Sequence, residues 1–188
     1  VHQLAGDRRA VAAMAGEVLA LSEKYGLSAY EGYAATLHDW ATGQEERARA
    51  IVGGLSAIGC KLGLSYYGSL VADTQAARGE LTAAIACIDH CLSLCHENGE
   101  RFYEPELHRR RALVEAQQDP LADGVRASLE RAAELARHQD MPRVEALSML
   151  ELCRRFGGDT QRRARLDELL ALHPGLREIE SDGHQGGQ

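Results

Sequence analysis

The chain has 188 residues, a net charge of −7 and a sequence pI near 5.6. This length allows one domain with a hydrophobic core, and the acidic balance argues against a nucleic-acid-binding surface, which needs a basic face. No apolar run reaches the ~20 residues that span a bilayer, so we expect contact with neither nucleic acid nor membrane. The five cysteines are odd in number and lack the spacing of a disulfide framework, which favours a reducing cytoplasm.

Composition and periodicity both predict an all-α fold. Ala, Leu, Glu and Arg dominate, while Val, Ile and Phe are scarce, and this balance favours helix over strand. Apolar residues recur at helical spacing, and short breaks containing Gly, Asp or Pro separate the periodic segments. We expect about nine helices, at about residues 5–25, 28–42, 44–59, 64–78, 80–98, 103–118, 123–139, 142–156 and 160–172.

Capping residues mark the ends of several of these segments. Ser28 and Glu31 have the spacing of a capping box, and Asp159 can cap the last helix. Residues 1–175 are predicted to form a single domain. The chain ends in SDGHQGGQ, which has no apolar side chain to bury, so residues 176–188 are predicted to be a disordered tail. The chain opens on Val1 directly before a helical pattern, and we expect it to be part of a longer protein.

The turns between helices recur at a regular interval. Gly43, Gly79 and Asp119 are separated by 36 and 40 residues, and each lies between two predicted helices. A helix pair that recurs every ~34 residues is typical of tetratricopeptide (TPR) arrays. A single pair cannot bury its own apolar face, so the pairs must stack. The sequence therefore predicts a tetratricopeptide-like, right-handed solenoid of antiparallel helix pairs.

The segment CIDHCLSLCH, at residues 87–96, raises the question of a metal or redox site. On a helix, Cys95 falls within an apolar stripe and Cys91 lies at its edge, whereas His90 and His96 point elsewhere. A structural zinc needs four converging ligands, and one straight helix brings two together at most. We interpret these cysteines as small buried residues, with a metal or redox site as the alternative. No hydrolase, zinc-protease or nucleotide-binding motif occurs, so we expect no enzyme activity, cofactor or metal.

Several segments, in order, resemble a known family. The most specific are GERFYEPELHRRR and AAELARHQ; the full set covers residues 18–27, 33–59, 66–94, 97–114 and 127–139. These segments are similar to the carboxy-terminal tetratricopeptide region of large bacterial regulators. In those proteins a STAND-type ATPase module precedes the repeats, and the output domain is a class III nucleotide cyclase or a winged-helix or LuxR-type DNA-binding domain. The chain departs from the family pattern at Thr36 and Leu37, and the similarity weakens beyond Phe156.

The predicted architecture places candidate binding residues on one face. The first helix of each pair lines the concave side of such a solenoid, where partners bind, and aromatic and Arg side chains are enriched at binding hot spots. The inward positions are Tyr30, Tyr33, Leu37, Trp40, Tyr66, Ser69, Asp73, Glu106, Arg109 and Leu113. Two alternatives stay open: the aromatic residues could be core between paired helices, and Arg109 with Glu106 could be a surface ion pair.

Two functional hypotheses follow. In the first, the chain is a sensor arm of a signalling ATPase involved in transcription regulation or nucleotide cyclisation, and it binds a protein, a peptide or its own ATPase domain. In the second, it is a stand-alone adaptor or scaffold. An array that opens with half a repeat leaves an apolar edge near the first helix, so we expect that two copies can pair as a homodimer through the exposed ends of the solenoid.

Overall fold

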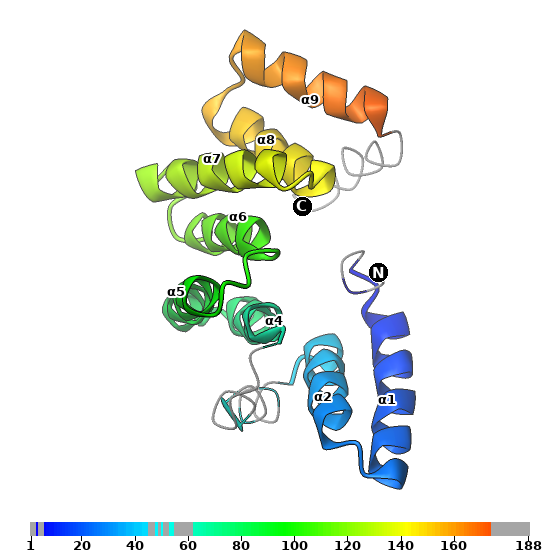
Figure 1. The fold of residues 1–188 in the computed structure, drawn as a ribbon. Coiled ribbons are helices and arrows are strands. Elements are labelled where there is room, and N and C mark those ends of the chain that lie inside the picture. The colour runs from blue at the N-terminus through cyan, green and yellow to red at the C-terminus, as the bar shows by residue number, and fades with distance from the viewer. Residues whose placement is uncertain are drawn as a thin grey trace. The chain divides into compact units, whose positions relative to one another are not determined.

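The computed structural model describes residue 3 and residues 6–44, 48, 50, 53–54 and 62–173. Within these residues the chain is all-α and contains no strand, which confirms the all-α part of the predicted fold class. The helix predicted over 44–59 falls largely outside the described residues, and the tail predicted over 176–188 falls wholly outside them. The helices are α1 (Arg8–Tyr25), α2 (Ser28–Thr42), α4 (Leu64–Ala77), α5 (Leu81–Asn98), α6 (Glu104–Glu115), α7 (Asp123–His138), α8 (Pro142–Phe156) and α9 (Thr160–Leu172) (Figure 1).

The described helices begin and end within three residues of the predicted bounds, and one predicted cap is wrong. Asp159 caps α9, since its Oδ1 accepts a hydrogen bond of 2.7 Å from the Arg162 backbone N–H. The capping box predicted at Ser28 is wrong, because Ser28 is already the first helical residue and Leu27 occupies the N-cap without a side-chain bond. The reason is the short link before it: Gly26 ends α1 in the left-handed conformation, and the Leu27 N–H bonds back to the Ser22 carbonyl. This tight closure leaves no room for a separate capping residue.

The chain forms two compact units, Val1–Arg101 and Phe102–Gln188. In the first unit α1 packs on α2, α2 on α4, and α4 on α5. Its core includes Val11, Trp40 and Leu70, one residue from each of three helices. These contacts hold α1, α2 and α4 together around the candidate site.

The second unit continues the same pattern of neighbouring helices. In it α6 packs on α7, α7 on α8, and α8 on α9, and α6 also contacts α8. Two clusters of buried apolar residues lie between these helices, one around Leu129 and Leu152 and one around Met149 and Leu169. Each helix is therefore held by the next one along the chain.

A buried carboxylate ties three helices of the second unit together. Glu145 of α8 is 2% exposed. Its oxygens accept hydrogen bonds of 2.8 Å from Arg137 of α7 and of 3.0 Å from Arg165 of α9. Burial alone would raise the pKa of Glu145, but the hydrogen bonds and charges of the two guanidinium groups outweigh it and lower that pKa. The carboxylate is therefore held in its charged form.

The cysteines of α5 pack against α4. Cys91 and Cys95 are 1% and 0% exposed, and the Cys87 thiol lies 3.4 Å from the Gly68 carbonyl oxygen. A Cβ placed on Gly68 would come within 2.5 Å of Cys91 Sγ, so the absence of a side chain there permits the close approach of the two helices. Cys91 therefore packs inside the α4–α5 pair.

Candidate partner-binding groove

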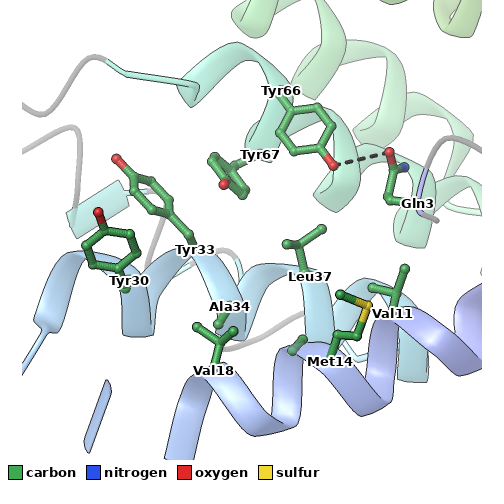
Figure 2. A pocket seen from close by; sticks show the side chains of 11 residues that line it. Gln3, Val11, Met14, Val18, Tyr30, Tyr33, Ala34, Leu37, Tyr66 and Tyr67 are labelled. Carbon is green, nitrogen blue, oxygen red and sulfur yellow. Dashed lines mark hydrogen bonds between the residues drawn. The ribbon is translucent and has the colours of Figure 1, made fainter. Parts of the chain in front are cut away.

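A hollow of about 380 Å³ opens between α1, α2 and α4 of the first unit (Figure 2). We call it the tyrosine groove, because four tyrosines from α2 and α4 form one side of it. Aliphatic side chains and a methionine, mainly from α1, form the other side. The lining residues are Gln3, Val11, Met14, Ala15, Val18, Tyr30, Tyr33, Ala34, Leu37, Tyr66 and Tyr67. An apolar hollow with a few polar groups at its edge is the usual form of a binding site.

The aromatic side of the groove is a packed cluster. The rings of Tyr33 and Tyr67 are stacked, with centroids 4.6 Å apart, and Tyr66 meets Tyr67 edge-on at 5.0 Å. The Tyr66 hydroxyl donates a hydrogen bond of 3.1 Å to Gln3 Oε1, as drawn in Figure 2. Burial raises the pKa of Tyr67, so its phenol stays protonated at neutral pH. Aromatic pairs of this kind present a large, preformed contact surface at a low entropic cost.

The opposite side of the groove is apolar and open to solvent. Met14 and Val18 of α1, on this side, are 56% and 40% exposed. Across from them, Tyr30 of the aromatic side is 62% exposed. Most large apolar side chains in a folded domain are buried, and a contiguous exposed set marks an interaction surface. The groove therefore combines rigid aromatic rings with accessible aliphatic groups, a combination that suits an apolar peptide or helix.

Four of the residues predicted to line a concave face do meet in this groove. Tyr30, Tyr33 and Leu37 lie on α2, and Tyr66 lies on α4 (Figure 2). Met14, Val18 and Tyr67 also line the groove, but they were not predicted from the sequence. The spacing of Met14 and Val18, together with Leu21 and Tyr25, would have revealed an apolar stripe on the first helix.

Three other predicted residues are used inside the first unit. Trp40 is 5% exposed, packs in the core, and donates a 3.1 Å hydrogen bond from Nε1 to Asp73 Oδ2. The Arg8 guanidinium lies 4.5 Å from the Trp40 ring centroid. It also donates a hydrogen bond to the backbone carbonyl oxygen of Trp40. Ser69 is fully buried and its hydroxyl donates to the Tyr66 carbonyl oxygen at 2.7 Å. The prediction that Trp40 and Ser69 lie on an accessible face therefore does not fit their burial, and Asp73 holds Trp40 in place.

The remaining predicted pair, Glu106 and Arg109, lies in the second unit on α6. Glu106 is 6% exposed, and its carboxylate accepts two 2.7 Å hydrogen bonds from Arg109 and a third of 3.1 Å from Arg110. Burial acts to raise the pKa of Glu106, but the two arginines lower it overall. Arg109 and Glu106 therefore form the ion pair that the sequence analysis left open as an alternative to partner binding. The pair is largely buried, whereas a surface pair was expected. Leu113 on the same helix is partly buried.

The described part of the chain offers no arrangement for metal binding. Among those residues, no group of three or more His, Cys, Asp or Glu side chains lies close enough together to hold an ion. Among the described residues, Cys87, Cys91, Cys95 and Cys153 form no disulfide. Burial raises the pKa of the Cys153 thiol, although Arg162 and Arg163 act in the opposite direction, so the reactive thiolate is not favoured there. No helix within the described ranges is long and apolar enough to cross a membrane.

A second hollow, of about 320 Å³, lies between α7, α8 and α9 of the second unit. Charged groups surround it, including Arg162 and Glu130, whose Nη2 and Oε1 atoms are 3.2 Å apart. An ion pair thus lies at the edge of the second hollow, whereas the tyrosine groove exposes aromatic and aliphatic side chains. This difference makes the tyrosine groove the stronger candidate.

Comparison with models of protein families finds no match, and neither the curated proteins nor the solved structures include a similar one.

Proposed function

We propose that the chain is a non-catalytic, tetratricopeptide-like interaction module that binds a protein or peptide partner in the tyrosine groove. The observation that carries the proposal is the groove itself, where stacked tyrosines face exposed Met14 and Val18. The sequential packing of helices within each unit, with α6 also contacting α8, supports a repeat architecture. Aromatic anchors in a preformed apolar hollow are the usual source of binding energy in such modules.

A displayed peptide library provides the test. The purified chain would be immobilised, peptides selected on it, and the affinity of enriched peptides measured by fluorescence anisotropy. The groove variant is Tyr30→Ser, which removes a ring that is 62% exposed and so does not disturb the core. We expect this variant to bind the enriched peptides at least about tenfold more weakly, as is common for a lost aromatic anchor.

The matched control is Phe102→Ser, which removes another exposed aromatic ring, 55% accessible, from the second unit. It should bind the same peptides with unchanged affinity. Equal losses in both variants, or selection of peptides that are insensitive to Tyr30, would contradict the assignment of the groove.

The resemblance to regulator repeats supports a more specific role. We propose that the chain is the carboxy-terminal regulatory arm of a bacterial signalling ATPase that controls a transcription factor or a nucleotide cyclase. Partner binding would shift the ATPase between states through its differential affinity for them. Cys87, Cys91 and Cys95 form no disulfide among the described residues, which is compatible with a reducing cytoplasm.

The mass of the native gene product separates this role from that of a stand-alone adaptor. A regulatory arm predicts a product several times the 20.5 kDa of the present chain, detected by immunoblot in the source organism. A product near 20.5 kDa would exclude the regulatory arm and leave the adaptor.

A further inference from the structure

Helix α1 carries an exposed apolar stripe along its length. Met14, Val18, Leu21 and Tyr25 are 56%, 40%, 53% and 62% exposed, and they follow one another at intervals of four, three and four residues. Apolar residues at this alternating interval form the seam between two paired helices. The flank of α1 next to the stripe, which includes Ala15 and Ser22, is already buried against α2. The stripe thus begins at the wall of the tyrosine groove, with Met14 and Val18, and continues along α1 through Leu21 and Tyr25.

Charged residues border the stripe on its other flank. Glu17 and Lys24 are both exposed and lie seven residues apart, so at 100° per residue they occupy the same row along the helix. Both lie on the side of the stripe away from Ala15 and Ser22. In a pair of helices, residues in this row lie opposite the corresponding row of the partner helix and determine its direction.

The order of these charges makes α1 complementary to itself in the antiparallel direction. When Val18 of one copy faces Leu21 of a second copy, Met14 faces Tyr25 and the apolar stripes match over their whole length. In the same register Glu17 lies beside Lys24 of the second copy, and the two-fold symmetry repeats this ion pair. A parallel pairing would instead place Glu17 beside Ser22, which is buried under α2. The charges therefore select the antiparallel arrangement.

We propose that α1 is a self-association surface through which two copies of the chain form an antiparallel, two-fold symmetric dimer. The seam contains four apolar side chains from each copy. Their buried surface is far smaller than the roughly 800 Å² per partner of a standard stable interface. The dimer is therefore weak, with a dissociation constant in the micromolar range or above. Met14 and Val18 belong both to this seam and to the tyrosine groove, so dimer formation and partner binding compete for them. The dimer forms without a partner, so a mass measurement on the chain alone tests it separately from the function proposed above.

Sedimentation equilibrium of the full chain, from low micromolar to millimolar concentration, is the first test. We expect the average mass to rise with concentration from 20.5 kDa towards twice that value. Leu21→Gln places a polar amide in the seam and should weaken the dimer at least about tenfold. Leu121→Gln changes a leucine that is 63% exposed in the second unit and should have no effect. A mass that stays at that of the monomer up to millimolar concentration, or equal effects of the two substitutions, would overturn the proposal.

Charge exchange tests the direction of the pairing. Glu17→Lys or Lys24→Glu alone replaces both ion pairs by like charges and should weaken the dimer by about fivefold or more at low salt, and by less at high salt. A mixture of the two single variants should form a heterodimer. In it the lysine introduced into one copy meets the glutamate introduced into the other, and the unchanged Lys24 meets the unchanged Glu17. The double variant, with Glu17→Lys and Lys24→Glu in the same chain, should regain the dimer affinity of the wild type.

Failure of the mixture and of the double variant to recover would contradict the antiparallel register. Circular dichroism of each variant would verify that helicity is kept. Both charge changes lie at exposed positions, so the test remains available even if Leu21→Gln disturbs the fold.

Discussion

At the scale of single residues, the contact between Gly68 and Cys91 determines how closely α4 and α5 approach. Gly68 is helical and buried, and it faces the sulfur of a cysteine that is 1% exposed. Glycine normally weakens a helix by about 1 kcal/mol relative to alanine, so its presence here is compensated by the packing it permits. The cysteine fills the space that the missing side chain leaves.

Gly68→Ala should therefore lower the free energy of unfolding of the first unit by about 1–3 kcal/mol, as overpacking commonly does. The control is Gly16→Ala on α1, where an added Cβ would have no neighbour within 4 Å. This substitution should raise the stability by roughly 0.5–1 kcal/mol. Denaturant unfolding followed by the fluorescence of Trp40, the only tryptophan, reports on the unit that contains both glycines.

A double variant separates the steric effect from other causes. Adding Cys91→Ala to Gly68→Ala removes the sulfur that the new methyl group would meet, so the two changes together should cost less than the sum of their separate costs. Additive costs, or a stabilising effect of both glycine substitutions, would show that this contact does not limit the helix approach.

At the scale of whole helices, α9 is held by charge as well as by apolar packing. Leu166, Leu169 and Leu170 cover part of the second unit's core. Arg165 adds bonds to the buried carboxylate of Glu145, which also accepts from Arg137 of α7. Removing one partner of a buried ionic cluster leaves the other groups imperfectly satisfied, so α9 should be sensitive to changes at Glu145.

Glu145→Gln should destabilise the second unit by about 1–3 kcal/mol and speed the hydrogen exchange of α9 amides. The matched control is Glu168→Gln, since Glu168 also pairs with Arg165 but its side chain is 55% exposed. That change should alter stability by no more than about 0.5 kcal/mol. Similar exchange rates in the two variants would contradict the role assigned to Glu145.

The same carboxylate predicts a pH dependence. Its pKa is lower in the folded protein than the value of about 4.3 of an unfolded glutamate. The unfolded state therefore binds the proton more readily, and the stabilisation is present above that pH and is lost as the pH falls through the folded-state pKa. Unfolding measured from neutral pH to about pH 3 should show this loss in the wild type and a smaller one in Glu145→Gln.

The sequence predicted the helices well, because they depend on local periodicity and on breaks such as Gly26 and Gly43. It was less successful for side chains whose direction depends on the tertiary packing. Trp40 and Ser69 occupy inward positions in the predicted repeat, but the close approach of α2 to α4 encloses them. Tyr30, near the start of α2, stays exposed. Periodicity identifies the face of a helix, whereas burial depends on which other helix covers that face.

The segment GERFYEPELHRRR, which resembles the regulator repeats, shows the same limit of prediction from sequence. Glu100 accepts hydrogen bonds from the Gly63 N–H at 2.6 Å and from the Ser65 hydroxyl at 3.0 Å, so it caps the start of α4. Glu106 and Arg109 bond to each other. These residues thus stabilise the helices that carry them, and a pattern of this kind carries little information about a ligand.

At the scale of the whole molecule, each unit has its own apolar core. The first contains the cluster around Trp40, and the second contains the clusters around Leu129 and Met149. Units of this size can bury enough surface to fold alone, although with a small stability margin. Their cores differ in composition, so their stabilities have no reason to be equal.

We therefore expect the unfolding curves from Trp40 fluorescence and from circular dichroism not to coincide. Fluorescence follows only the first unit, whereas the dichroism signal follows the helices of both. A fragment of residues 102–188 should retain the helical signal of α6 to α9 on its own. Coincident curves together with an unfolded fragment would show that the two units fold as one.

The position of Met14 in the wall of the groove has a chemical consequence. Its side chain is 56% exposed, whereas Met149 is 6% exposed and Met141 is partly covered, so peroxide should reach the Met14 sulfur first. Conversion to the sulfoxide replaces a flexible apolar group by a polar one, in a surface whose contacts are otherwise apolar. Protein handled in air would then lose binding in the groove without unfolding. Mass spectrometry of the α1 peptide would detect the added oxygen, and a methionine sulfoxide reductase should restore the surface.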